Sequence, residues 1–185
     1  MTARLADRVC VVTGAAGGIG RAIATRFAAD GGRIACVDIS ANRLEPAVAA
    51  LVEAGTEARA YRVDIGHRAD VISLFERIEA EFRAPVAVLV NNAVWARFQP
   101  LAEIDEETLA RMFAVGLQAL IWTLQAAAPQ MKRRGGGTVV NLSSVSAWQA
   151  VPHSIAYAAL KAGVLGLTRS AAVELSSERY GSSFL

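Results

Sequence analysis

Short apolar runs alternate with longer, alanine-rich stretches along this chain, and this alternation constrains the fold more than any other feature. The runs cover Val9–Thr13, Arg33–Asp38, Ala58–Val63, Val86–Asn91 and Thr138–Ser143. Three of them are apolar at nearly every position, which is typical of strands buried on both faces of a parallel sheet. Helical patterns lie near Ile19–Ala29, Arg43–Ala54, Arg68–Phe82, Glu106–Arg134 and Ser154–Glu178. The alternation predicts an α/β fold with a doubly wound parallel sheet.

Length and composition fit one such domain and exclude several other classes of protein. The chain has 185 residues, which is the length of a single domain (1–185), and 54% of them are hydrophobic, which excludes a disordered chain. A net charge of +2 gives no basic surface for nucleic acid. Two cysteines and two histidines cannot build a disulfide scaffold or a histidine-rich metal site. The sequence shows neither an uninterrupted membrane-spanning run nor a secretory signal at its start, so we expect a soluble, cytoplasmic protein.

A glycine-rich turn separates the first predicted strand from the first predicted helix. Gly14, Gly18 and Gly20 have the spacing G-x3-G-x-G. A turn without Cβ atoms lets the backbone approach a pyrophosphate, and a helix that begins near Ile19 offers free N–H groups and a positive dipole. The alternative is a tight turn with small residues for packing. The position of the turn, directly after the first strand, favours nucleotide binding.

Asp38 strengthens this interpretation because it ends the second predicted strand, eighteen residues after Gly20. A carboxylate there can accept hydrogen bonds from the adenosine ribose hydroxyls and would repel a 2′-phosphate. Neither Ala16 nor Ile39 offers a cation that would reverse the preference. The alternative is a solvated aspartate at a strand end. Next to the glycines we favour the functional interpretation, with NAD as the cofactor.

A serine, a tyrosine and a lysine form a second candidate cluster. Tyr157 and Lys161 are four positions apart on a predicted helix, so their side chains share one face. Ser144 lies at the end of the fifth predicted strand, at the sheet edge where ligands bind. A nearby ammonium favours a phenolate, so the pair could exchange a proton with an alcohol or ketone whose oxygen Ser144 holds. The alternative for a tyrosine and lysine at this spacing is ordinary helix surface.

Taken together, these motifs resemble the short-chain dehydrogenase/reductase family. They are Thr13–Gly20, Asp38, Asp64 with Ile65, Asn91–Ala93, Asn141–Ser144 and Tyr157–Gly163, and the resemblance extends from about Asp7 to Gly181. It implies a Rossmann-type sheet with strand order 3-2-1-4-5 and hydride transfer between NAD and a secondary alcohol or ketone.

The same resemblance implies a role for each matching residue. Tyr157 would be the acid/base, and Lys161 would favour its deprotonated form and hold the nicotinamide ribose. Ser144 would orient the substrate oxygen. Further cofactor contacts would come from Gly14, Gly18, Ile19, Gly20, Asp38, Asp64, Ile65 and Asn91, of which Asp64 and Ile65 would flank adenine and Asn91 would line the adenosine side.

The sequence departs from the family pattern in three places. Val94 stands where the family has a glycine. Gly116 stands where the family has an asparagine that completes a proton relay through water; a glycine there either permits a local helix distortion or packs on a buried stripe. After Tyr180 and Gly181 the family continues into a sixth strand, whereas this sequence ends at Leu185. We therefore expect a chain truncated at its C-terminus.

The expected truncation would change the surface of the protein. Alternate residues of Val86–Val90 and Thr138–Leu142 would face solvent, and the fifth strand would be an unpaired edge prone to self-association. The fourth and fifth predicted helices, which form a dimer contact in the family, are retained, so we expect a homodimer. A competing hypothesis is an impaired remnant that binds a dinucleotide or only dimerises.

Apolar and aromatic residues follow the fourth and fifth predicted strands, at the expected mouth of the site. They are Trp95, Phe98, Trp148 and Val151, with His153 beside them. They could form an apolar substrate wall, and the alternative is packing within the loops.

Overall fold

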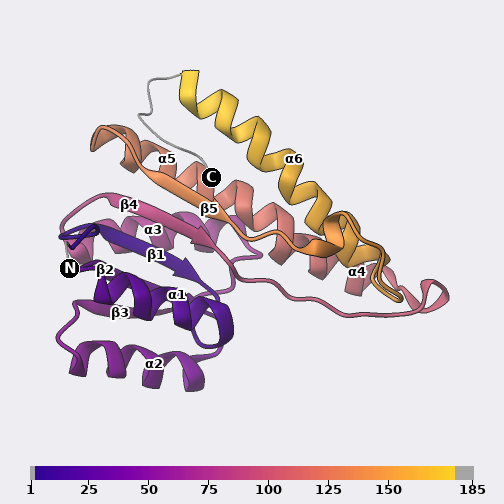
Figure 1. Ribbon diagram of the computed structural model, residues 1–185, viewed down its shortest axis with the longest axis horizontal. Coiled ribbons are helices and arrows are strands. Elements are labelled where there is room, and N and C mark those ends of the chain that lie inside the picture. The colour runs from indigo at the N-terminus through magenta and orange to yellow at the C-terminus, as the bar shows by residue number, and fades with distance from the viewer. Residues whose placement is uncertain (1–2, 178–185) are drawn as a thin grey trace.

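Five parallel strands form one sheet in the computed structural model, which describes residues 3–177. The strands are β1 (Val9–Thr13), β2 (Arg33–Asp38), β3 (Ala58–Arg62), β4 (Val86–Asn91) and β5 (Thr138–Asn141). Their order across the sheet is β3-β2-β1-β4-β5 (Figure 1), which confirms the predicted Rossmann-type topology. The part of the chain after residue 177, including Tyr180 and Gly181, lies outside the described residues.

Helices cover both faces of this sheet. The α-helices are α1 (Gly18–Ala29), α2 (Ala41–Glu53), α3 (Arg68–Phe82), α4 (Glu106–Phe113), α5 (Ala119–Arg133) and α6 (Ile155–Ser177). Shorter helical segments are η1 (Leu101–Glu103), the π-helical η2 (Ala114–Gln118) and η3 (Val145–Ala147). α1 and α2 pack on one face, and α3, α5 and part of α6 pack on the other. This is the distribution that right-handed crossovers require.

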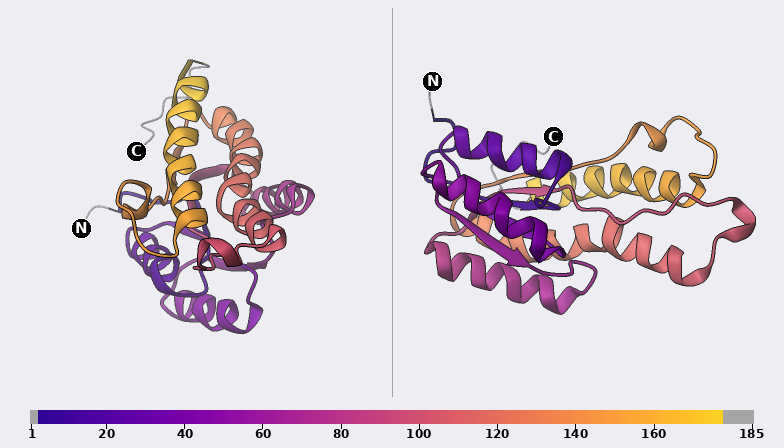
Figure 2. Two further views of the ribbon diagram at one scale, coloured as in Figure 1. Left: turned by 90° about the vertical axis from the view of Figure 1, so that its right-hand side faces the viewer. Right: turned by 90° about the horizontal axis from the view of Figure 1, so that it is seen from below.

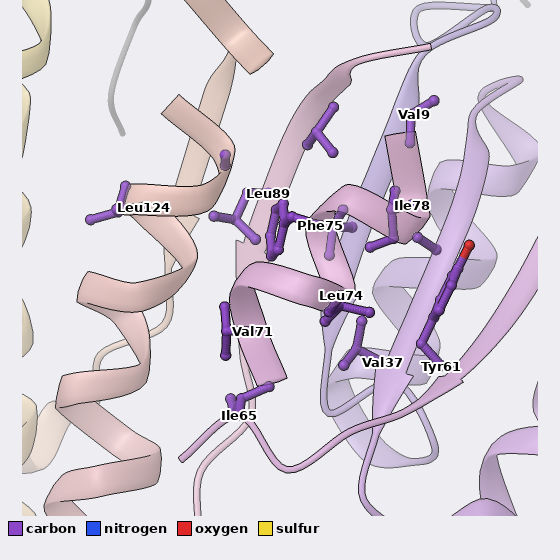
Figure 3. Close-up of a cluster of buried hydrophobic side chains, with 14 of the residues drawn as sticks. Val9, Val37, Tyr61, Ile65, Val71, Leu74, Phe75, Ile78, Leu89 and Leu124 are labelled. Atoms are coloured by element: carbon purple, nitrogen blue, oxygen red, sulfur yellow. The ribbon is translucent and has the colours of Figure 1, made fainter. Parts of the chain in front are cut away.

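Alternating side chains of the central strands build the two halves of the core. Val9 and Val37 point to the side of α3, where Leu74, Phe75 and Ile78 meet them (Figure 3). Their neighbours in sequence, including Cys10 and Cys36, point to the side of α1 and α2. Both thiols are free and fully buried, as a central position in the sheet requires.

The predicted exposure of alternate residues of Val86–Val90 is wrong, because all five residues of this stretch are buried. Ala87, Val88 and Val90 belong to the same cluster of buried residues as Ala24 of α1 and Leu44 of α2. At the end of the strand order, Val140 and Leu142 are half-buried and pack against this cluster. β4 is therefore covered on both faces, and β3 and β5 are the two edge strands of the described sheet.

The segment Glu106–Arg133 is the one described helix whose length and hydropathy would suit a membrane span. Half of its most apolar window is buried inside the protein. Ala119, Leu124 and Met131 pack in the core between the sheet and α3. A core helix has these same properties, so the burial accounts for the apolar composition.

The segments that follow β4 and β5 extend beyond the carboxyl ends of the strands, together with α4 and the first turns of α6 (Figures 1 and 2). A backbone hydrogen bond of 3.0 Å from Gln99 N–H to His153 O joins the two segments. The carboxyl edge of a doubly wound sheet is where ligands bind. This extension therefore sets the position of the candidate site.

Candidate functional site

The turn between β1 and α1 has a backbone that favours glycine. Gly14 has φ +69° and Gly18 has φ +51°, both in the left-handed region. A Cβ on Gly14 would lie 2.6 Å from Asn92 Nδ2, and a Cβ on Gly20 would overlap the Gly14 carbonyl oxygen. The α1 N-cap, Gly17, supplies no capping side chain. The first N–H groups of α1 are therefore free to bind an anion such as a pyrophosphate.

A cavity of about 800 Å³ opens beside this turn, a volume within the range of cofactor sites. Its walls include six of the predicted cofactor residues, namely Gly14, Gly18, Ile19, Asp38, Asp64 and Ile65. Gly20 is buried behind the turn, where its lack of a Cβ permits the close approach of Gly14. The structure therefore brings most of the predicted cofactor residues together around one cavity of ligand size.

Asp38 is held by two backbone N–H groups at the end of β2. Its Oδ2 accepts from Ala16 N–H at 3.1 Å and its Oδ1 from Ser40 N–H at 2.9 Å. These bonds orient the carboxylate and leave each oxygen a further lone pair for a ligand hydroxyl. Arg43 also lines the cavity, and its Nε donates to Ser40 Oγ at 3.2 Å. Sequence reasoning missed this cation, because only the start of α2 turns it toward the cavity.

Asn91 lies in the interior of the protein, whereas its neighbour Asn92 lines the cavity. The Asn91 Nδ2 donates to Asn141 Oδ1 at 2.8 Å, and its Oδ1 accepts from Thr123 at 2.9 Å. Asn92 Nδ2 donates to the Thr13 carbonyl oxygen at 2.8 Å. Successive side chains at a strand end point to opposite sides. The structure thus places Asn92, not the predicted Asn91, in the cavity wall.

Asp64 forms a second acidic position in the cavity, after β3. Its Oδ1 accepts from Gly66 N–H at 2.9 Å and its Oδ2 pairs with Arg111 Nη2 at 2.8 Å. Burial by itself would raise the pKa of Asp64, but the hydrogen bonds from Arg111 and Gly66 and the positive charge of Arg111 together lower it. Arg111 comes from α4 and also lines the cavity, although its position in the sequence carried no signal.

Tyr157 and Lys161 lie together on α6, as their spacing predicts. Lys161 is only 4% exposed, its Nζ donates to the Leu142 carbonyl oxygen at 2.6 Å, and Nζ lies 5.8 Å from the centre of the Tyr157 ring. Burial lowers the pKa of Lys161. The ring of Phe98 lies 5.2 Å from that of Tyr157. A buried ammonium beside a half-buried phenol is an arrangement suited to proton transfer.

Ser144 follows β5, close in the chain to the residues that tie β5 to α6. Its Oγ accepts from Ser146 N–H at 3.1 Å and so caps η3. Ser143 Oγ donates to the Lys161 carbonyl oxygen at 2.9 Å. Ser144, Tyr157 and Lys161 are not among the cavity-lining residues. The segment after β4 connects the two regions, because its Val94 and Trp95 line the cavity and its Phe98 contacts Tyr157.

Gly116 lies in a local helix distortion and also packs in the interior, which are the two alternatives that the sequence left open. It lies in the π-helical η2, so the helix is distorted there. It is also buried, and a Cβ at this position would lie 2.6 Å from Leu160 Cδ1. Leu160 therefore occupies the space into which an asparagine side chain at position 116 would extend.

Comparison with known proteins identifies the family. A family model described as short chain dehydrogenase matches residues 8–179. The chain belongs to this family. Among its relatives, D-threitol dehydrogenase of Mycolicibacterium smegmatis is 36% identical over 92% of this chain and 65% of its own length. The (3R)-3-hydroxyacyl-CoA dehydrogenase of Rattus norvegicus is 36% identical over 93% of this chain and 70% of its own length.

Solved structures of other short-chain dehydrogenases have the same fold. A putative short-chain alcohol dehydrogenase from Sinorhizobium meliloti superposes with a TM-score of 0.91 at 28% identity, covering 98% of this chain and 71% of the other. An NAD⁺-bound xylitol dehydrogenase superposes with a TM-score of 0.89 at 32% identity, covering 94% and 67%. The chain thus spans about two thirds of the length of these short-chain dehydrogenases.

Proposed function

We propose that this short-chain dehydrogenase is an NAD-dependent oxidoreductase acting on a secondary alcohol or the corresponding ketone. The observation that carries the proposal is the glycine cradle and oriented Asp38 carboxylate at one end of the site, with buried Lys161 beside Tyr157 at the other. Bound NAD would supply the hydride acceptor, and its reduced form the donor. The cradle fits such a cofactor because the first N–H groups of α1 face the cavity without a capping side chain. Gly14 and Gly20 make this tight turn possible, since a Cβ on either would collide with Asn92 or with the Gly14 carbonyl oxygen.

The residues around Tyr157 would handle the proton in this reaction. The Lys161 ammonium favours the phenolate of Tyr157, which then accepts the proton of the substrate hydroxyl. In the reverse direction the phenol donates this proton to the ketone oxygen. The Ser144 hydroxyl hydrogen-bonds the same oxygen and stabilises its partial negative charge. Phe98, whose ring is tilted against that of Tyr157, and Trp148, which is 78% exposed, supply an apolar wall for the substrate.

Tyr157→Phe tests this chemistry. The change removes one hydroxyl and keeps the ring contact with Phe98. We expect turnover of a panel of secondary alcohols to fall by at least about 100-fold with an unchanged Kd for NAD, because acid–base catalysis is worth 10²–10⁴-fold. Equal turnover by the variant and the unmodified chain would contradict the role of Tyr157.

Cofactor choice depends on the balance between Asp38 and Arg43. The Asp38 carboxylate favours a free ribose diol, whereas the Arg43 guanidinium would attract a 2′-phosphate. We expect NAD to bind at least about tenfold more tightly than NADP in calorimetric titrations, because both Asp38 oxygens are oriented by backbone N–H groups. Asp38→Asn should reduce this ratio. Tighter binding of NADP by the unmodified chain would reject the assignment.

A second candidate function is dinucleotide binding with little or no turnover. Leu160 against Gly116 favours it, because an apolar side chain fills the place where the family's proton relay would run. NAD-induced stabilisation without turnover of any alcohol in the panel would support this candidate. Turnover that is lost in Tyr157→Phe would support the enzyme.

Assembly and location complete the proposal. A homodimer through the α4–α5 segment and α6 is supported by exposed apolar residues on all three helices, namely Leu109, Ile121 and Val173. The composition, with a net charge of only +2, and a mostly hydrophobic interior support a soluble, cytoplasmic protein. Light scattering after size-exclusion chromatography should give about twice the mass of 19.5 kDa, and a monomeric mass at all concentrations would reject the dimer.

A further inference from the structure

Arg111 lines the cavity, and the proposed chemistry gives it no role. We infer that Arg111 is a positioning residue, which holds the Asp64 carboxylate so that it recognises the amino group of an adenine base. This inference rests on the proposed function, because it requires a dinucleotide in the cavity. It gives α4 a part in a site whose other acidic and glycine residues come from strand ends and the turns that follow them.

The geometry of the pair is well defined. Arg111 Nη2 lies 2.8 Å from Asp64 Oδ2, while Gly66 N–H binds the other oxygen, Oδ1, at 2.9 Å. Each carboxylate oxygen is thus held by one donor, and each keeps a lone pair for a ligand. The two side chains are about one quarter to one third exposed, and both line the cavity. The ion pair therefore lies at the surface that a ligand would touch.

Gly66 leaves the space that the Arg111 guanidinium occupies. A Cβ at this position would lie 2.9 Å from Arg111 Nη1 and 3.1 Å from Asp64 Oδ1. The N-terminus of α4 is fixed independently, because Asp105 Oδ1 accepts from Thr108 N–H at 2.7 Å. The turn after β3 and helix α4 are thus arranged to bring Asp64 and Arg111 together in one orientation.

The chemistry of a carboxylate indicates what this arrangement selects. An ionised carboxylate only accepts hydrogen bonds, and the one donor group on an adenine base is its exocyclic amine. Arg111 keeps Asp64 ionised and prevents its rotation, since a planar guanidinium binds a carboxylate in a fixed geometry. Without Arg111, Asp64 would keep its Gly66 contact but lose both the neighbouring charge and the restraint on Oδ2.

A merely structural ion pair would behave differently. Arg111 and Asp64 link α4 to the turn after β3, so breaking the pair lowers stability in either case. Only the positioning role predicts a change in the choice between bases. The test therefore compares NAD with nicotinamide hypoxanthine dinucleotide, in which a carbonyl oxygen replaces the adenine amine.

Calorimetric Kd values for the two dinucleotides measure this choice. We expect the unmodified chain to prefer NAD by about tenfold, which is the low end for a hydrogen bond to a charged group. Arg111→Met should reduce the preference to below about threefold, mainly by weakening NAD. Arg111→Lys, which keeps the charge without the planar fork, should give an intermediate value. Asp64→Asn should abolish the preference, and adding Arg111→Met to it should have no further effect on the ratio.

Arg133→Met is the matched control. Arg133 pairs with Glu79 at 2.6 Å and joins α5 to α3 outside the cavity, so its loss should leave the preference near tenfold. A thermal melt of each variant shows that it is folded before titration. A tenfold preference in folded Arg111→Met would overturn this inference and leave the proposed function intact. Failure of the unmodified chain to bind either dinucleotide would overturn both.

Discussion

Lys161 places an ammonium group where almost no water reaches it, so the neighbouring protein atoms determine its interactions. Its Nζ binds the Leu142 carbonyl oxygen and faces the Tyr157 ring, so the ammonium has few other partners within the fold. Burying a charge is costly unless it is hydrogen-bonded. The protein accepts this cost at a position where the charge lies beside the Tyr157 phenol, which is typical of a functional residue.

The burial of Lys161 predicts a dependence of stability on pH. Burial lowers its pKa in the folded protein below the ordinary value of 10.5, so the unfolded chain binds more protons between these two values. Below the folded-state pKa, the buried charge of Lys161 should lower the free energy of unfolding by a constant amount. Between the folded-state and the unfolded-state pKa, this destabilisation should decrease as the pH rises. Urea denaturation of the unmodified chain and of Lys161→Met at about pH 8 and pH 10 measures the difference.

Lys132→Met provides the comparison, because Lys132 is exposed on the last turn of α5. The free energy of unfolding of the unmodified chain minus that of Lys161→Met should increase with pH. The corresponding difference for Lys132→Met should not increase in the same way. A stability of the unmodified chain relative to Lys161→Met that falls as the pH rises would contradict the assignment.

The helix through η2 shows how a single element can serve both packing and function. The π-turn at Ala114–Gln118 brings Gly116 against Leu160 of α6, and Leu160 is fully buried. One extra residue per turn changes the direction of the side chains that follow. The same helix carries Arg111 before the π-turn and the core residues of α5 after it. The element thus connects the cavity to the core between the sheet and α3.

Gly116→Ala should destabilise the protein by about 1–3 kcal/mol, because its Cβ would overlap Leu160 in a closed core. Leu160→Ala should cost about 2–5 kcal/mol through the cavity that it leaves. In the double variant the new methyl group enters that cavity, so the combined loss should be smaller than the sum of the two. Urea denaturation of all four proteins gives the coupling, and strict additivity would show that the two positions do not share one space.

At the scale of the whole molecule, the sheet separates two cores whose side chains do not reach the solvent. Cys10 and Cys36 lie on adjacent strands on the side of α1 and α2. Burial raises the pKa of each thiol to about 12, so neither is a nucleophile at neutral pH in the folded state. Access to them requires removal of the helices or separation of the strands.

The two thiols therefore report global unfolding. With a chromogenic disulfide reagent at neutral pH, we expect no rapid labelling of the folded protein and labelling of two thiols in denaturant. At a reagent concentration high enough for labelling to outpace refolding, the slow rate under native conditions should equal the rate of global unfolding, because both thiols are fully buried in the central strands. Fast labelling of either cysteine in the folded protein would show that the sheet opens locally.

Sequence patterns were sufficient wherever the information was local. The apolar runs placed five strands, and the glycine spacing placed a turn whose backbone favours glycine at Gly14. The helical spacing of Tyr157 and Lys161 put them on one face, since four residues make about one turn.

The remaining features depended on contacts between residues distant in the chain. The pairing of Arg111 with Asp64 joins α4 to the turn after β3, and the sequence around either residue gives no indication of its partner. The inward direction of Asn91, the burial of Val88 and the contact of Leu160 with Gly116 also arise only when separate elements pack. The sequence by itself determined the order of elements, the glycine turn and the residues at the strand ends, because backbone sterics and hydrophobic periodicity act over a few residues. The tertiary structure alone decided which side chains face the cavity and which are sealed in the core, because that depends on the packing of surfaces that the chain brings together from far apart.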